Sequence, residues 1–215
     1  MILKSRSNLA LACGLSAIAG YVDGIGFIHL GGLFVSFMSG NSTRLGVSSA
    51  EGNWPNALHA LQLIGLFVLG AAIGTLMVQG RSRYRQSVLL LLEAVLLAAA
   101  ALCYPLGWPE VAIAGLVLAM GMENAVFQVG GSAGLGLTYV TGALVKIGQT
   151  LAQALDGGPR WAWLPNLLLW LALVIGSVTG ALAYHRINLD AIWFAAGAAL
   201  FMCAIFAVRA RLSHQ

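Results

Sequence analysis

The chain has 215 residues, about 60% of them apolar and only 8% charged. An ordinary soluble domain carries roughly 25% charged residues, so this composition excludes a soluble enzyme and predicts an integral membrane protein. The net charge of +4 comes from basic residues at the edges of apolar stretches. That pattern orients membrane proteins and indicates no nucleic-acid partner.

Apolar length and charged or Pro/Gly boundaries predict six transmembrane helices. They cover residues 8–29, 55–79, 86–105, 110–128, 161–184 and 188–207. The first stretch follows Lys4 and Arg6 as a signal peptide would, but it is too long for one, so we interpret it as the first span. The cysteines show no metal-ligand spacing, so neither a metal site nor a cofactor is expected.

Two further segments, 31–50 and 132–155, are apolar but also carry hydroxyls, a cation and several glycines. This mixture predicts broken or re-entrant elements. Non-helical backbone is tolerated at membrane depth only where protein or a water-filled cavity satisfies its polar groups. The two segments therefore indicate a shielded interior in an otherwise all-α membrane domain.

The chain reads as a duplication of one unit. Hydroxyl, aromatic, glycine and cation recur in the same order in residues 36–46 and 138–148, which align without gaps. Flanking matches join residues 20–25 to 121–126 with one gap, and Gly70-x-x-x-Gly74 to Gly176-x-x-x-Gly180. We therefore divide the chain into repeats 1–105 and 106–215, each with three spans and one re-entrant segment, within one compact domain.

An odd number of spans in each repeat inverts the second half relative to the first. If both re-entrant segments return to the side they entered, nearly all flanking cations fall on the cytoplasmic side, together with both termini. Full crossing of both segments would instead place the cluster at residues 81–85 outside. Inverted repeats with interrupted helices are a recurring transporter plan, with the substrate site near the midplane.

The stretches at residues 20–24, 31–41 and 138–142 strongly resemble the YoaK-type family of bacterial inner-membrane proteins, a family catalogued as a domain of unknown function. The resemblance covers nearly the whole chain, and Phe-Met-Ser-Gly-Asn is its most specific stretch. It implies a six-span, multi-pass protein of the bacterial inner membrane. It implies no substrate.

Two intramembrane cations are the first candidates for site residues. A charge at membrane depth is costly, so by default it suggests a functional role. They are Arg44 and Lys146, at equivalent positions of the repeat. Each follows a polar stretch that could start a half-helix and bind a solute: Ser39, Gly40 and Asn41 in the first repeat, and Thr141 and Gly142 in the second. Free N–H groups and the helix dipole would then favour an anion. Snorkelling cations and ordinary glycine packing are the alternatives.

Three embedded acids are candidates for charge pairing or coupling. Asp23 precedes Arg44, and Glu123, followed by Asn124, precedes Lys146, which predicts one ion pair in each half. A purely structural pair is the alternative, since buried pairs often add little stability. Glu93 stands alone in a Leu/Ala-rich span, where it is either protonated and hydrogen-bonded, which we favour, or proton-coupling.

The sequence thus favours a secondary transporter or channel-like permease for a small polar solute, preferably an anion, with its site between the repeats. A non-transport scaffold or assembly subunit is the alternative, and no catalytic motif indicates an enzyme. The expected partners are the lipid bilayer and the solute. The Gly-xxx-Gly motifs leave a homodimer open, although packing within the bundle is favoured. His29 and His59 are interpreted as residues of the membrane interface.

Overall fold

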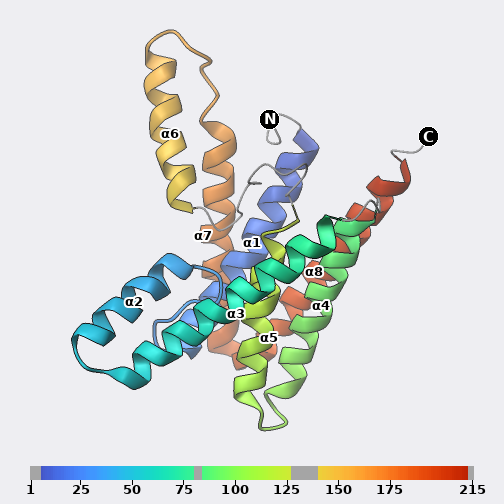
Figure 1. The fold of residues 1–215 in the computed structure, drawn as a ribbon. Coiled ribbons are helices and arrows are strands. Elements are labelled where there is room, and N and C mark those ends of the chain that lie inside the picture. Colours follow the sequence, from blue (N-terminus) through green and yellow to red (C-terminus); the bar gives the residue numbers. More distant parts are fainter. Residues whose placement is uncertain (1–5, 80–83, 127–139, 213–215) are drawn as a thin grey trace.

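The computed structural model describes residues 6–79, 84–126 and 140–212. In those ranges all regular structure is helical, as predicted (Figure 1). The helices are α1 Arg6–His29, α2 Met38–Ala50, α3 Trp54–Val78, α4 Arg85–Cys103, α5 Pro109–Glu123, α6 Val140–Leu155, α7 Leu164–Ile187 and α8 Ile192–Leu212, with a 3-10 turn η2 Asn188–Ala191 before α8. The predicted re-entrant segment 31–50 becomes a linker followed by α2. Residues 132–139 of the other segment lie outside the described residues.

Helix boundaries follow local sequence signals. Proline occupies the first turn of α3, α5 and α7, where its missing N–H costs no intrahelical bond. The Asn53 side chain caps α3 by accepting from the backbone N–H of Asn56 at 3.4 Å. The chain leaves α7 at Asn188, whose φ of 58° breaks the helical path.

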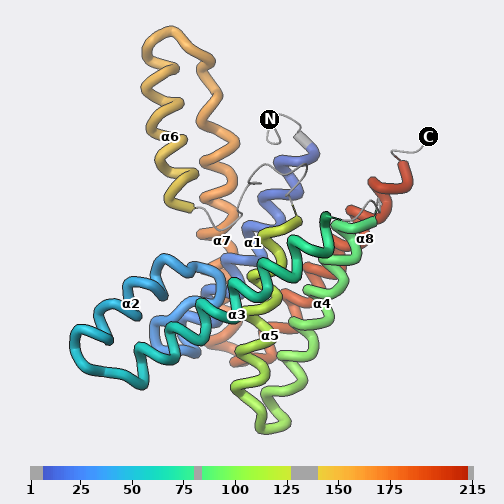
Figure 2. Tube along the Cα trace, viewed as in Figure 1, coloured from blue at the N-terminus to red at the C-terminus, as the bar shows by residue number. Residues whose placement is uncertain are grey.

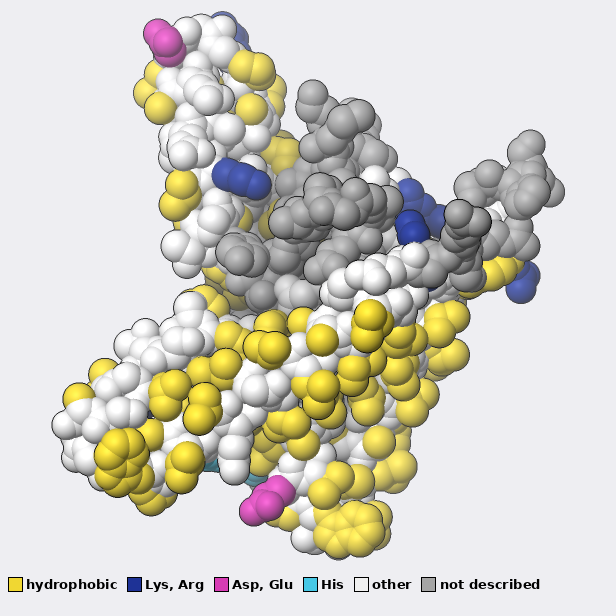
Figure 3. Space-filling view, viewed as in Figure 1, with side chains coloured by type: hydrophobic (Ala, Val, Ile, Leu, Met, Phe, Trp, Pro, Cys, Tyr) yellow, Lys and Arg dark blue, Asp and Glu magenta, His cyan; other side chains and the backbone are white. Residues whose placement is uncertain are grey.

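Four stretches of the described chain are long and apolar enough to cross a membrane: Ser7–His29, Trp54–Val78, Arg85–Cys103 and Leu164–Leu212. The last contains both α7 and α8. Helix α5 is shorter than the predicted 110–128, because it ends at Glu123 and a turn follows. Apolar side chains cover the outward face of α3, α4 and α5 (Figure 3), as lipid contact requires.

Glycines bring α1 and α7 into backbone contact. A Cβ added at Gly20 or Gly24 would collide with a carbonyl oxygen of α7, and one added at Gly176 or Gly180 with a carbonyl oxygen of α1. The contacts advance along both helices together, so α1 and α7 run parallel. Small residues allow this close approach in membranes, where van der Waals packing drives helix association.

A second pair, α3 and α5, is built in the same way. Gly70 and Gly74 face carbonyl oxygens of α5, and Gly121 faces the carbonyl oxygen of Phe67. This pair also runs parallel, but opposite in direction to α1 and α7 (Figure 2). Helix α4 packs between α5 and α8. The predicted use of Gly-xxx-Gly within the bundle is confirmed for these glycines.

Two shorter helices extend from the bundle as hairpins. Helix α2 packs on α3, and α6 packs on α7. Both begin near the centre of the molecule and diverge from there, α6 toward the top of the view and α2 toward the lower left (Figure 1).

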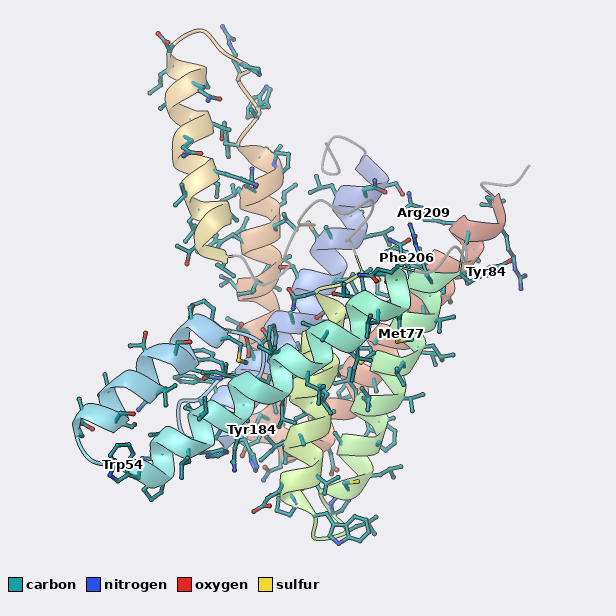
Figure 4. All side chains as sticks on the ribbon, in the orientation of Figure 1. Trp54, Met77, Tyr84, Tyr184, Phe206 and Arg209 are labelled. Carbon is teal, nitrogen blue, oxygen red and sulfur yellow. The ribbon has the colours of Figure 1, made fainter. Side chains whose placement is uncertain are left out.

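The ends of the first and last helices lie together. Arg209 Nη2 donates to Asn8 Oδ1 at 2.9 Å, which joins the end of α8 to the start of α1. In Figure 4 Arg209 lies at this end of the molecule beside Phe206, whereas Trp54 lies at the turn between α2 and α3, far from it. Trp54 is 63% exposed, as expected of an interfacial anchor.

Candidate functional site

A cavity of about 510 Å³ opens between α1, α7, the α1–α2 linker (residues 30–37) and the start of α6. This volume is in the usual range of small-molecule sites. The wall carries three phenyl rings and three polar side chains: Phe27, Phe34, Phe37, Asp23, Ser36 and Ser177. The ring of Phe34 lies 4.9 Å from that of Phe27 and 5.2 Å from that of Phe37, measured between centroids. The cavity is therefore mostly apolar, with a few polar groups.

Asp23 holds the linker in place. Its Oδ1 accepts from the backbone N–H of Val35 at 2.9 Å and of Ser36 at 2.7 Å, and its Oδ2 accepts from the Ser36 hydroxyl at 2.5 Å. All three residues are buried. Non-helical backbone in a membrane needs partners for its N–H groups, and this one carboxylate satisfies two of them.

Asn41 completes the support from the other side. Its Oδ1 accepts from the Phe34 N–H at 2.9 Å, and its Nδ2 donates to the Phe34 carbonyl oxygen at 2.7 Å. The Asn41 side chain is fully buried. It lies in the first turn of α2 but binds the preceding linker, so it fixes how α2 enters the bundle.

The first turns of α2 and α6 converge on the cavity. Phe37, directly before α2, and Val140, the first residue of α6, both line its wall. Helix N-termini carry a partial positive charge. At the start of α2 the N–H groups of Met38 and Gly40 already donate to the carbonyl oxygens of Ser36 and Phe37, so the helix dipole is the main contribution there. Helix α2 begins at Met38, directly before the stretch Ser39, Gly40 and Asn41 that was expected to start it, and Asn41 binds the preceding linker rather than capping the helix.

The two cations do not line this cavity. Arg44 and Lys146 are exposed, and so are Ser39 and Thr141. The Arg44 guanidinium folds back over Gly32, where an added Cβ would collide with it. The polar part of the described wall therefore consists of two helix starts, the hydroxyls of Ser36 and Ser177 and the carboxyl of Asp23, with neither cation among them.

Both predicted ion pairs are wrong. Asp23 is bound by linker N–H groups and a hydroxyl, and no ion pair joins it to Arg44. The Glu123 carboxyl makes no hydrogen bond, and Lys146 lies exposed on α6. Asp23, which the sequence interpretation paired with Arg44, instead accepts hydrogen bonds from the backbone N–H groups of Val35 and Ser36. Asn124 donates to the Met120 carbonyl oxygen at 2.9 Å within its own helix end.

Glu93 of α4 and Glu123 of α5 are both fully buried, and all four of their carboxyl oxygens lack a hydrogen-bond partner. Glu123 interacts electrostatically with Glu93 and Asp23. The three acids thus form one group spread over α1, α4 and α5. The expectation of a hydrogen-bonded Glu93 is wrong.

Sequence reasoning missed Ser36, Ser177 and the three phenyl rings as cavity residues. Ser36 could have been found by asking which donors satisfy Asp23, since a buried carboxylate needs them. Ser177 follows Gly176 of a motif already identified, but its orientation depends on helix packing. His29 Nδ1 lies 3.1 Å from the Tyr184 hydroxyl oxygen, within hydrogen-bond distance. Among the described residues, no three or more His, Cys, Asp and Glu side chains are grouped so that they could hold a metal ion.

The chain matches the family described as "Protein of unknown function (DUF1275)" over residues 11–205. UPF0700 transmembrane protein RA0705 of Rhizobium meliloti (strain 1021) is 38% identical over 201 residues, which cover 94% of this chain and 87% of that protein. UPF0700 transmembrane protein YoaK of Bacillus subtilis (strain 168) is 29% identical over 154 residues, 68% of this chain and 67% of YoaK. No solved structure matches significantly.

Proposed function

Starting from the fact that this chain belongs to the DUF1275 family, with transmembrane proteins as relatives, we propose that it is a secondary transporter or channel-like permease for a small solute. The observation that carries the proposal is the cavity on which the starts of α2 and α6 converge. Half-helix N-termini at the midplane are how several transporter folds bind solutes.

An inverted repeat is part of the proposal. Exchanging α1 to α4 with α5 to α8 maps the parallel pair α1/α7 onto the parallel pair α5/α3, and each pair is joined through glycines. The same exchange maps the hairpin α2/α3 onto α6/α7 and leaves the contact of α4 with α8 unchanged. The opposite directions of the two pairs in Figure 2 support inversion over simple duplication.

The chemistry of the cavity wall limits the class of solute that it can bind. The two helix starts favour a hydrogen-bond acceptor such as a carbonyl group, whereas the Asp23 carboxyl at the wall disfavours a full negative charge. The rings of Phe27, Phe34 and Phe37 favour an apolar part beside it. We therefore propose a small solute with hydrogen-bond acceptors at one end and an apolar body, which passes through the protein chemically unchanged.

The membrane orientation follows from charge. We propose six crossings in the bacterial inner membrane, with both chain ends cytoplasmic. The α1 and α8 ends are adjacent, and Arg209 and Arg211 lie in the last turn of α8. Lys and Arg accumulate on the cytoplasmic side of bacterial membrane proteins.

A flux assay tests the proposal. The protein is reconstituted into proteoliposomes, and uptake is measured for a panel of small anions, zwitterions and neutral metabolites. Ala181→Phe places a ring in the cavity and should abolish uptake of any solute that the parent carries. Leu182→Phe, on the exposed side of the same helix, is the matched control and should retain it. Equal uptake by both variants would remove the cavity from the transport path.

A scaffold or assembly subunit is the second candidate. Helix α6 has no buried residue and extends with α7 from the bundle, which leaves a surface that a partner protein or a second copy could cover. Absence of uptake across the whole panel, together with a stable complex retained through purification from native membranes, would favour this function.

A further inference from the structure

The buried acids of α4 and α5 are unusual because nothing balances them. Glu93 and Glu123 have no exposed surface, and none of their carboxyl oxygens has a hydrogen-bond partner. Their surroundings are apolar: Leu89, Leu90 and Leu97 on α4 and Met120 on α5 are all fully buried. A buried carboxylate without a partner is far costlier than a buried neutral carboxylic acid.

Within the described ranges, the neighbouring helices place no compensating cation beside the two acids. Helix α1 contributes the carboxyl of Asp23. From α8 comes the neutral thiol of Cys203, which donates to the Ser87 carbonyl oxygen. His59 is the one ionisable residue of α3 and lies near its start, several turns from the part that packs on the end of α5. Two further ionisable residues lie within α1 and carry no positive charge: Cys13, and Tyr21, whose hydroxyl donates to the Ala191 carbonyl oxygen. The other ionisable residues of these helices lie near helix ends: Arg6, His29, Arg85, Cys103, Glu110, Arg209 and Arg211.

Two carboxyl groups that interact in an apolar interior do not both ionise, since like charges raise the cost of the second ionisation. At least one of the two carboxyl groups must therefore be protonated. A metal ion would need several ligands, and the described residues contain no group of three or more His, Cys, Asp and Glu side chains that could hold one.

We propose that Glu93 and Glu123 form an intramembrane proton-binding site, which binds a proton from one side of the membrane and releases it to the other. No bond other than O–H is made or broken. The proposal rests on the transport function above and names its coupling ion. The link to the solute runs through Asp23, which interacts with Glu123 and holds the linker at the cavity wall. A change in charge at Glu123 therefore alters the electrostatic energy of Asp23, the residue that positions Val35 and Ser36.

Dicyclohexylcarbodiimide, an apolar reagent that modifies protonated carboxyl groups, tests the site without any solute. We expect mass spectrometry of the full-length protein in liposomes to find modification at Glu93 or Glu123. The rate should fall about tenfold for each pH unit above the titration midpoint. Exposed Glu110 on the same helix as Glu123 is the internal control and should stay unmodified. Absence of labelling at both buried acids, or protection by sodium at constant pH, would overturn the proton site.

Glu93→Gln and Glu123→Gln keep the shape of the protonated acid, so both variants should fold with unchanged thermal stability. Any solute uptake that a pH gradient drives in the parent should be lost in both, whereas Glu110→Gln should retain it. Labelling without uptake of any solute would retain the proton site and overturn the transport proposal. Uptake that ignores the pH gradient and survives both substitutions would retain transport and overturn the coupling.

Discussion

Removing the carboxylate of Asp23 tests how the broken segment is held. Asp23→Ala leaves the N–H groups of Val35 and Ser36 without their acceptor, and both residues are at most 2% exposed. A buried polar group left without a partner costs about 1–3 kcal/mol, so the two N–H groups together predict a loss of about 2–6 kcal/mol. The Ser36 hydroxyl can rotate toward another acceptor and is left out of this value.

Asp23→Asn separates hydrogen bonding from charge. The new amide oxygen can accept both N–H groups, and the amide nitrogen can donate to the Ser36 hydroxyl, so all three contacts can persist with one reversed. We expect Asp23→Asn to unfold within a few degrees of the parent and Asp23→Ala on the order of 10 °C lower. Thermal unfolding in detergent, followed by circular dichroism, measures both. Equal midpoints for the parent and Asp23→Ala would refute the assigned role of Asp23.

Three further predictions follow from the packing and the proposed topology. Gly176→Ala should destabilise the bundle by separating α7 from α1, whereas Gly197→Ala, in open space on α8, should not; equal thermal midpoints would contradict the backbone contact. Gly40→Val should disturb the rings of Phe34 and Phe37 and lower stability more than Gly46→Val, which meets no atom; a reversed order would contradict the crowding. In a cysteine-free background, Leu106→Cys should react with an impermeant thiol reagent from outside only, and reaction from the cytoplasmic side would overturn the orientation.

The sequence was sufficient to predict most helix positions. Apolar length and proline or charge boundaries gave α3 and α4 to within two residues at each end. These signals depend only on neighbouring residues in the sequence, so they can be interpreted without knowing how the helices pack. The end of α5 was missed because apolar residues continue beyond Glu123 after the helix has stopped. The predicted number of six spans and the inversion stay predictions.

The site was harder to predict because its polar side chains, Asp23 and Asn41, form hydrogen bonds with backbone groups of the linker. A charge pattern shows which side chains can attract one another, and on that basis Arg44 was assigned to Asp23. It does not show that the linker would supply two N–H groups and a hydroxyl to the same carboxylate. Asn41 was correctly singled out, but its role depends on reaching back to Phe34, a contact that exists only once the linker has folded.

The proposed repeats differ where their chemistry matters. In the alignment of residues 20–25 with 121–126, Asp23 corresponds to Asn124, and Glu123 corresponds to Val22. At these aligned positions the first half places an acid where linker N–H groups satisfy it, and the second half places an acid one position earlier, without a partner. A proton bound by Asp23 would change the contacts with Ser36 and Val35 through which this side chain holds the linker. The carboxyls of Glu93 and Glu123 have no such partners and are free to exchange a proton. Holding of the linker is therefore assigned to Asp23 of the first half, and proton binding to Glu123 of the second half together with Glu93 of the first.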